Sequence, residues 1–384
     1  MHNSNNNNNT LSTQEKKKFL QLRRDFQKPV LGIAGYLGKT TLIEMISAVL
    51  ETRGKVLRTP RGNGSWKNNL STLEKLNCSY DYAIFEFDYQ RGKNFASLLR
   101  LIKPNIAVVT NIGDAHLTYL KDAMRLALKR SEVVNYIARD GIAVLNQDDD
   151  MSSSLSKYIS TPHVYKYGLN HIAHFHASNI QHLGPKGIRF ILNSEKEIEL
   201  PIYSVSNVYT FLACAATCTN LGFTIDEIVE FIHQNFELPK GRGNLHKIGN
   251  IYLVDESYLG TSRSVSKAAR TLVGFKPYTK KIVLILGDMT EPGVKVEDRH
   301  LNMGYFLSAL PLDYLITLGH YAEFIAKGAS LIQSKSKKVI SVKNVDELLQ
   351  TLDGILAGNM AVSVKGLGNV VFHRIKSFIE NKKI

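Results

Sequence analysis

The sequence has few cysteines, a single tryptophan and no long apolar run. Its 384 residues include three cysteines, Cys78, Cys214 and Cys218, too few to hold a chain of this length together by disulfides. Cys214 and Cys218 stand four residues apart in an alanine-rich stretch, which favours a buried helical pair over a metal or redox site. No apolar run reaches the roughly 18 residues of a membrane-spanning helix. The first residues offer no apolar core for a secretory signal, so we expect a cytoplasmic protein.

Acidic residues are also scarce relative to basic ones. The chain has 34 Asp and Glu against 48 Lys and Arg, which gives a net charge of +14. Such an excess suggests an anionic partner: nucleic acid, acidic lipid or a phosphorylated small molecule. No aromatic RNA-binding motif, helix-turn-helix pattern or long basic stripe accompanies the charge. A nucleic-acid partner is therefore not expected, and solvated surface charge is the simplest explanation.

The order of apolar segments predicts an α/β protein. The polar start, with the run Asn5–Asn9, reads as flexible, and a short helix is possible at Ser12–Arg24. Apolar strand-like runs then alternate with helical patterns, which favours a mostly parallel sheet with helices on both faces. Strands are expected at 82–87, 105–112 and 142–146, and helices at 96–102 and 123–137.

Two interruptions divide this pattern. Short alternating runs at 160–202 predict a small antiparallel β insert. After the glycine-containing stretch 237–244, strands and helices alternate again, which predicts a Rossmann-like α/β domain. We therefore expect a flexible head, 1–28, a P-loop central domain, 29–240, and a C-terminal domain, 241–384.

A glycine loop lies between the first predicted strand and the first predicted helix. It contains Gly35, Gly38, Lys39, Thr40 and Thr41. Glycines let backbone N–H groups surround a phosphate, the lysine adds positive charge near the β and γ phosphates, and the threonine hydroxyl can bind Mg²⁺. The strict P-loop pattern has glycine where Ile33 stands. The context still predicts nucleoside triphosphate binding, with an ordinary glycine turn as the alternative.

Polar residues follow the next two predicted strands. Glu86 ends an apolar run, and Asp88 follows it. Glu86 is the candidate Mg²⁺ ligand, with a surface carboxylate as the alternative. The strand at 105–112 brings Asn111, Asp114 and His116 to the same carboxyl edge, where ligands of open α/β sheets bind.

Taken in order, ten segments resemble the landmarks of the Mur ligase superfamily. The likeness spans about residues 29–370 and is greatest to the branch that adds D-alanyl-D-alanine to a UDP-muramoyl-tripeptide. The segments are GIAGYLGKTT, IFEFD, VVTNIGDAHL, AVLNQDD, SVSNVYTFLACAA, LPKGRGN, LVDESYLGTSRS, VLILGDMTEPG with His300, ITLGHYAEFIAKGA and VSVKG.

The resemblance implies an ATP- and Mg²⁺-dependent ligase that joins a carboxylate to an amine through an acyl phosphate. By position, Lys39 would bind phosphates, Thr40 and Glu86 would hold one magnesium, and His116 would help to hold a second. The further residues that the resemblance assigns are Asn207, Arg242, Asp255 and Glu256 on the nucleotide, with Arg242 reaching the phosphates when the domains close, and Asp288 and Lys365 on the substrate side.

Three departures from the family pattern stand out. Arg130 occupies the place of a lysine that the family carbamylates, and Lys129 beside it would point elsewhere on the helix. Arg130 could instead contact the phosphoryl oxygens, the second metal could be bound weakly or not at all, or Arg130 could be solvated and have no role. The family's adenine-side turn has become Tyr258–Ser262, and Ser206 and Thr210 replace a histidine and an asparagine. The third departure concerns the start of the sequence: the family has a UDP-binding domain before its phosphate loop, and in the polar head of about 28 residues we expect no such domain.

We therefore expect an ATP-dependent acid–amino-acid ligase that acts on an amino-acid or peptide-like small molecule. Two alternatives stay open. The chain could add D-alanyl-D-alanine with a protein partner in place of the missing domain, or it could be an inactive nucleotide-binding scaffold.

Overall fold

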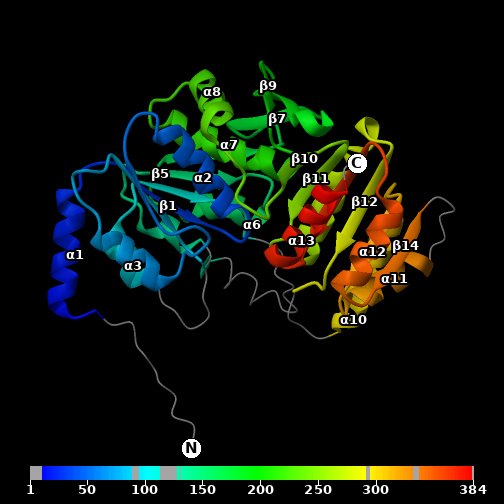
Figure 1. Cartoon of the computed structure of the whole chain (residues 1–384). Helices are drawn as coiled ribbons and strands as arrows, with labels where there is room; N and C mark the ends of the chain where they lie inside the picture. Colours follow the sequence, from blue (N-terminus) through cyan, green and yellow to red (C-terminus); the bar gives the residue numbers. More distant parts are fainter. Residues whose placement is uncertain are drawn as a thin grey trace, which may run out of the picture. The chain divides into compact units, whose positions relative to one another are not determined.

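The computed structural model describes residues 11–88, 95–112, 128–129, 131–290, 295–331 and 337–382. Contacts divide the chain into two compact units (Figure 1). The first contains 1–178, 191–196 and 209–236, and the second contains 179–190, 197–208 and 237–384. Among the described helices, none combines the length and the apolar character needed to cross a bilayer.

A nine-stranded sheet organises the first part of the chain, in the order β2-β3-β1-β4-β5-β6-β7-β8-β9. The pairs from β2 to β6 are parallel. The strands are β1 (Val30–Ala34), β2 (Val56–Arg58), β3 (Tyr82–Glu86), β4 (Ile106–Val109), β5 (Ile142–Asn146), β6 (His163–Gly168), β7 (Phe175–His182), β8 (Ile188–Leu192) and β9 (Lys196–Leu200).

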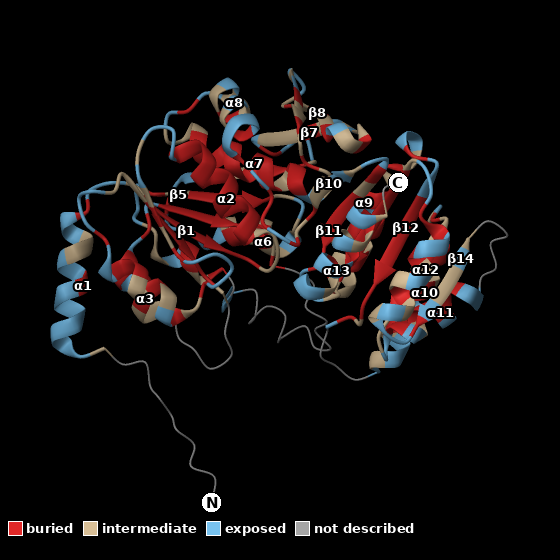
Figure 2. Cartoon of the chain, viewed as in Figure 1, coloured by how far each residue is buried: buried red, intermediate tan, exposed pale blue. Residues whose placement is uncertain are grey.

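Helices cover this sheet. The helical segments are α1 (Thr13–Asp25), α2 (Lys39–Leu50), α3 (Trp66–Glu74), α4 (Ala96–Ile102), α6 (Asp150–Ser154), α7 (Val205–Thr219) and α8 (Ile225–Asn235), with short 3₁₀ turns η1 (Glu132–Tyr136), η2 (Leu155–Lys157) and η3 (Gly184–Lys186). Alternate strand residues, such as Ala83 and Phe85, pack with α3 and α4 in one apolar cluster. Every residue of α2 is buried, as Figure 2 shows by its red colour.

The antiparallel insert begins later than the sequence predicts. The segment β6, which falls inside the predicted insert, pairs in parallel with β5 because the chain crosses over through α6 and η2 before reaching it. Tight turns join β7 to β8 and β8 to β9, closed by hydrogen bonds from Leu183 N to Gly187 O and from Glu195 N to Leu192 O. Such short connections form antiparallel hairpins, so the insert comprises β7 to β9.

The helix α1 is an ordered part of the first unit, although the sequence places it in a flexible head. A capping box between Ser12 and Glu15 starts the helix. Its Phe19 joins the apolar cluster, and Arg23 donates to Ile102 O at 2.7 Å and to Lys103 O at 3.0 Å. Burial lowers the pKa of Arg23. One buried aromatic ring and one anchored guanidinium thus order a segment whose composition is polar.

We expect Phe19→Ala to lower the free energy of unfolding by about 3 kcal/mol, because a fully buried ring leaves a cavity. Phe19 is 2% exposed, whereas its neighbour Leu20 is 39% exposed. Urea unfolding of the full chain measures the loss, with Leu20→Ala as the matched control and an expected change within about 0.5 kcal/mol. Equal losses for both variants would contradict the packing of α1.

The second unit contains a six-stranded sheet in the order β10-β11-β15-β12-β13-β14. Only the pair β10–β11 is antiparallel among its described pairs. The strands are β10 (Asn244–Ile248), β11 (Ile251–Glu256), β12 (Lys281–Leu286), β13 (Tyr314–Leu318), β14 (Lys338–Val342) and β15 (Met360–Lys365).

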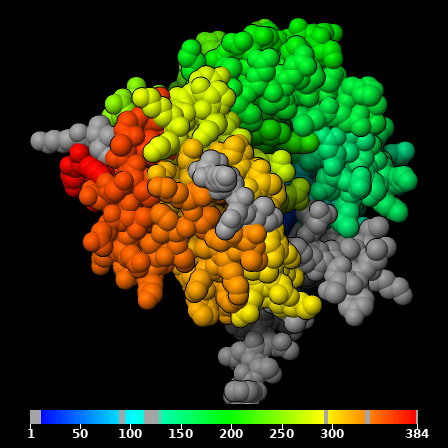
Figure 3. Space-filling view, turned by 90° about the vertical axis from the view of Figure 1, so that its right-hand side faces the viewer, coloured from blue at the N-terminus to red at the C-terminus, as the bar shows by residue number. Residues whose placement is uncertain are grey.

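Two apolar clusters lie on opposite faces of this sheet. One involves α12 (Val345–Ile355) and α13 (Gly368–Asn381), and the other α9 (Ser262–Val273), α10 (Val296–Ser308) and α11 (Ala322–Leu331), with the turn η4 (Lys276–Tyr278) nearby. In the space-filling view, residues coloured yellow to red form one close-packed body (Figure 3). This is the doubly covered α/β arrangement that the alternating pattern predicts.

Candidate functional site

A glycine turn joins β1 to α2 at the carboxyl edge of the first sheet. Gly35 and Gly38 have φ values of 127° and 87°, in the region that favours glycine. A Cβ on Gly35 would lie 2.2 Å from Thr110 Oγ1, so a side chain does not fit there. The helix α2 starts after Gly38 with no capping side chain and no acidic residue in its first turn. Its first N–H groups are therefore available to an anion.

Asn111 holds this turn in shape. Its backbone oxygen accepts from Tyr36 N at 2.6 Å, and its side-chain amide accepts from Leu37 N and donates to Leu37 O, both at 3.2 Å. The sequence predicts Asn111 as a nucleotide ligand. In the structure its hydrogen bonds to Tyr36 and Leu37 fix the conformation of the loop. A direct contact between Asn111 and a nucleotide stays a prediction.

Lys39 is buried within the turn that it follows. Its Nζ donates to Gly35 O at 3.0 Å and lies 2.8 Å from Asp88 Oδ1. The side chain of Lys39 is 9% exposed. A positive charge is thus fixed beside the free N–H groups of α2.

Thr40 and Glu86 meet beside the same loop. β1 and β3 are neighbours with Ile33 opposite Glu86, so the carboxylate emerges beside the start of α2. Thr40 Oγ1 donates to Glu86 Oε1 at 3.4 Å, and both residues are buried. Thr41, next in the helix, is buried as well.

Several predicted residues fall outside the described part of the chain. Asp114, His116 and Arg130 belong to this group. Lys129 is described and exposed, and its Nζ lies 3.8 Å from Glu132 Oε1. The predicted second magnesium and the role of Arg130 thus remain predictions.

The helix α7 carries the next predicted position. Asn207 is buried in its first turn, where its backbone N–H and its side chain bond with the Ser204 hydroxyl. Thr210, which departs from the family pattern, lies near the glycine turn, since a Cβ on Gly38 would be 3.9 Å from its Oγ1. The hydroxyl of Thr210 thus borders the phosphate turn.

The comparisons with known proteins agree with this geometry. The family model described as Mur ligase middle domain matches residues 33–218, which include the glycine turn, Glu86 and Asn207. Residues 33–218 form a Mur ligase middle domain. This assignment confirms the predicted superfamily and the predicted α/β fold class.

The relatives extend the likeness beyond the middle domain. The UDP-N-acetylmuramoyl-tripeptide–D-alanyl-D-alanine ligase of Escherichia coli is 26% identical over 85% of this chain and 73% of its own length. The same-named enzyme of Synechocystis is 28% identical over 82% of this chain and 67% of its own length. The chain is therefore homologous to ligases over most of its length.

Solved structures show the same fold. MurF from Acinetobacter baumannii has a TM-score of 0.80 at 24% identity over 96% of this chain and 79% of its own. MurF from Thermotoga maritima in complex with ADP has a TM-score of 0.80 at 20% identity over 96% of this chain and 83% of its own. The Mur ligase fold thus extends past the middle domain into the second unit.

The second unit of this Mur ligase homologue holds five more predicted residues, Arg242, Asp255 and Asp288 together with the pair Glu256 and Lys365. The guanidinium of Arg242 stacks 4.1 Å above the ring of Tyr258. Asp255 accepts from Gly241 N at 3.1 Å and from Ser257 N at 3.0 Å, so its carboxylate shapes a loop. Asp288 accepts from Ala322 N at 2.7 Å and holds the start of α11. Their predicted roles on nucleotide and substrate stay predictions.

The buried residues Glu256 and Lys365 form an ionic cluster with the half-buried Lys267. Glu256 lies opposite Lys365 in the β11–β15 register, and Lys365 Nζ is 3.7 Å from Glu256 Oε2. Lys267 Nζ is 3.8 Å from the second carboxylate oxygen, Glu256 Oε1. Within the described residues, Glu256 Oε1 has no hydrogen-bond partner. Burial lowers the pKa of Lys365 from 10.5 to about 8, against the opposing effect of Glu256.

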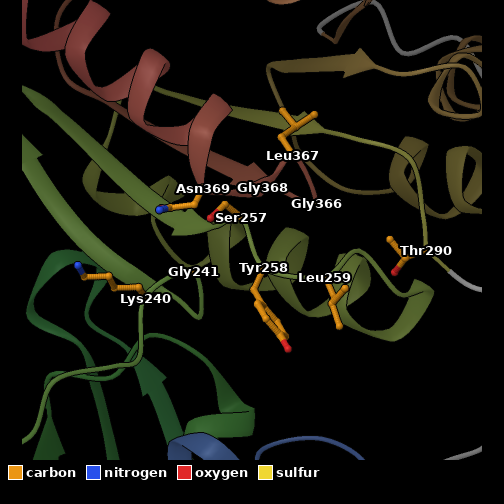
Figure 4. Close-up of a pocket in the computed structure, with 10 residues that line it drawn as sticks. All are labelled: Lys240, Gly241, Ser257, Tyr258, Leu259, Thr290, Gly366, Leu367, Gly368 and Asn369. Carbon is orange, nitrogen blue, oxygen red and sulfur yellow. The ribbon is translucent and has the colours of Figure 1, made fainter. Parts of the chain in front are cut away.

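A pocket of about 550 Å³ is lined by Ser257 and Gly366, the residues that directly follow Glu256 and Lys365 in the chain (Figure 4). It lies at the ends of β11 and β15, where the strand order of the sheet reverses, the usual ligand position in open α/β sheets. Its lining is part apolar and part polar. The residues are Lys240, Gly241, Ser257, Tyr258, Leu259, Thr290, Gly366, Leu367, Gly368 and Asn369. The sequence points to this pocket through Lys365, which directly precedes Gly366, and through the turn Tyr258–Ser262, whose first two residues line it.

The lowered pKa of Lys365 predicts a pH effect on stability. Between about pH 8 and 10.5 the unfolded chain holds this proton and the folded chain does not, so the free energy of unfolding rises with pH by up to about 3 kcal/mol. Urea unfolding at pH 7.5, 9 and 10 measures the rise. We expect Lys365→Met to abolish it and Lys247→Met, at an exposed site on β10, to retain it. A rise that survives in Lys365→Met would assign it to another group.

Sequence reasoning missed two features of the first site. One is the ion pair of Lys39 with Asp88. The other is Asn69, whose buried amide donates to Gly64 O and to Glu86 O and joins the loop after β2 to the end of β3. Asp88 was visible as a carboxylate two residues after Glu86, whereas nothing in the sequence marks Asn69.

Proposed function

We propose that this protein is an ATP-dependent ligase that joins a carboxylate to an amine. One observation carries the proposal: Lys39, Thr40 and Glu86 converge around an uncapped helix start within a Mur ligase middle domain. A cation, a hydroxyl and a carboxylate in this order are the groups that hold a nucleoside triphosphate and its metal.

The site fits a polyphosphate. The first N–H groups of α2 lack side-chain caps, and an added Cβ on Gly38 would be 3.9 Å from its nearest neighbour, so a phosphate can approach the backbone closely. Lys39 is buried and extended along the loop, where it would neutralise phosphoryl oxygens.

The site also fits magnesium. Thr40 and Glu86 offer a hydroxyl and a carboxylate oxygen within 3.4 Å of each other, and hard oxygen ligands suit this ion. When bound, Mg²⁺ would draw charge from the β and γ phosphates. We propose Thr40 and Glu86 as its ligands. His116, the further metal ligand that the sequence predicts, lies outside the described residues and stays a prediction.

The residues of the chain supply positioning and charge. The substrate carboxylate takes the γ-phosphoryl group and ADP leaves; the amine then attacks the acyl phosphate, and amide and phosphate are released after loss of a proton. Lys39 and the N–H groups of α2 would hold the transferred group in line and stabilise its charge, and Asn111 would keep the loop in that shape.

The substrates are small molecules in this proposal. The relatives are named for adding D-alanyl-D-alanine to a UDP-N-acetylmuramoyl-tripeptide. We propose an amino-acid or peptide-like acceptor here. Domain limits at 29–240 and 241–384, a cytoplasmic location and a partner protein remain part of the proposal.

A nucleotide-binding protein without ligase activity is the second candidate. It is favoured by Tyr258–Ser262, where the family's asparagines and proline are absent and Leu259 is 52% exposed.

The test is ADP formation. ATP, Mg²⁺ and a panel of muramoyl peptides, amino acids and dipeptides are supplied, and ADP is measured with each amine omitted in turn. Amine-dependent ADP release together with a new amide product supports the ligase. Tight ATP binding with no release under any combination supports the second candidate.

A further inference from the structure

The lysine of the phosphate turn already has an anionic partner on the protein. Lys39 Nζ and Asp88 Oδ1 are 2.8 Å apart, with the two side chains 9% and 32% exposed. Lys39 also donates to Gly35 O at 3.0 Å and to Tyr36 O at 3.4 Å. The ammonium group therefore has its hydrogen bonds satisfied without any phosphate.

Asp88 is held in place from its other oxygen. Its Oδ2 accepts from Gly64 N at 2.9 Å. Gly64 is fixed in turn by Asn69, whose Nδ2 donates to Gly64 O at 3.1 Å and to Glu86 O at 2.7 Å. An added Cβ on Gly64 would lie 2.6 Å from Glu86 O, so the loop and the strand end are in close contact. The carboxylate cannot turn away from Lys39 without losing the bond to Gly64.

A phosphate that reaches Lys39 arrives beside this fixed carboxylate. Two anions then share one ammonium group, and at contact distance in a partly buried site their repulsion is substantial. A polyphosphate alone must either displace Asp88 or accept this repulsion. A polyphosphate bound to Mg²⁺ carries less negative charge. The side-chain oxygens of Thr40 and Glu86, beside the same turn, are suitable ligands for the ion.

We infer that Asp88 makes nucleotide binding depend on the metal: it occupies Lys39 in the free protein and disfavours a nucleoside triphosphate that arrives without Mg²⁺. The inference rests on the proposed function, because it concerns the same phosphate turn. Asp88 is a selectivity residue in this scheme and takes no part in phosphoryl transfer.

The test compares the affinity for a non-hydrolysable ATP analogue with excess Mg²⁺ and with EDTA, by calorimetry on the full chain. In Asp88→Asn the carbonyl can still accept from Gly64 N while the charge is gone. We expect its affinity for the metal-free analogue to rise about 10-fold and that for the magnesium complex to rise less than about 3-fold. Asp140→Asn, at an exposed site of the same unit, should change neither.

Each other outcome has a meaning. If Asp88→Asn leaves the ratio of the two affinities unchanged, or weakens binding of both forms, Asp88 does not discriminate and the inference is wrong. If the wild type and Asp88→Asn bind neither form, the proposed function fails first. Asp88→Ser, which also removes the charge, must reproduce the change in the ratio, and circular dichroism of each variant checks that it is folded.

Discussion

Lys39→Ala is expected to lower amine-dependent ADP release by a factor of roughly 10³ or more, because the lysine supplies the fixed positive charge at the phosphates. The structure gives this charge no substitute among the described residues of the turn: Tyr36, Leu37 and Thr41 are uncharged. The measurement is coupled-assay turnover at saturating substrates, together with the affinity for ATP.

The fold should survive this substitution. Removing Lys39 leaves Asp88 with its bond from Gly64 N, and Asp88 is partly exposed to solvent. Lys55→Ala, at an exposed site of the same unit, is the control and should retain full activity. If the turnover of Lys39→Ala stays within about threefold of that of the wild type, the phosphate turn takes no part in the reaction.

Glu86→Gln is expected to reduce turnover by a factor of roughly 10² and to raise the Mg²⁺ concentration needed for half-maximal activity by at least about tenfold. The amide keeps the size of the side chain and can still accept from Thr40 Oγ1, so the loop should keep its shape. The charge that favours a divalent ion is lost. Activity as a function of Mg²⁺ concentration separates this effect from a general loss.

The matched control for Glu86 is Glu51→Gln, at the exposed residue that directly follows α2. It removes one negative charge from the same unit and should shift neither turnover nor the Mg²⁺ requirement. An unchanged Mg²⁺ requirement in Glu86→Gln would assign the metal to other ligands. The two variants of this site therefore test charge at the phosphate and charge at the metal independently.

Local patterns predicted the central strands and the phosphate turn. Apolar runs at 82–87 and 142–146 became β3 and β5, because strands buried on both faces are continuously apolar. The turn was predictable because glycine, lysine and threonine stand between a strand and a helix. The same reasoning overlooked β2, since Val56–Arg58 is too short to show a pattern.

Long-range contacts decided what the sequence left open. The order of α1 depends on Phe19 and on backbone oxygens near residue 102, about 80 positions away. The direction of β6 depends on its pairing with β5, which short alternating runs do not reveal. At the candidate site, the partner of Lys39 depends on how Asn69 and Gly64 place the end of β3. The composition of the sequence and the spacing of its residues do not reveal such contacts.

The contacts of Asp255 determine where a fragment that contains only the second unit can begin. Because Asp255 holds Gly241 N, and its backbone oxygen accepts from Gly243 N, the segment before β10 is fastened to the second unit on both sides of Arg242. A fragment of that unit must begin ahead of residue 240 to keep these bonds. One that begins at Asn244 would leave the buried Asp255 without two of its partners and would lose Arg242 altogether.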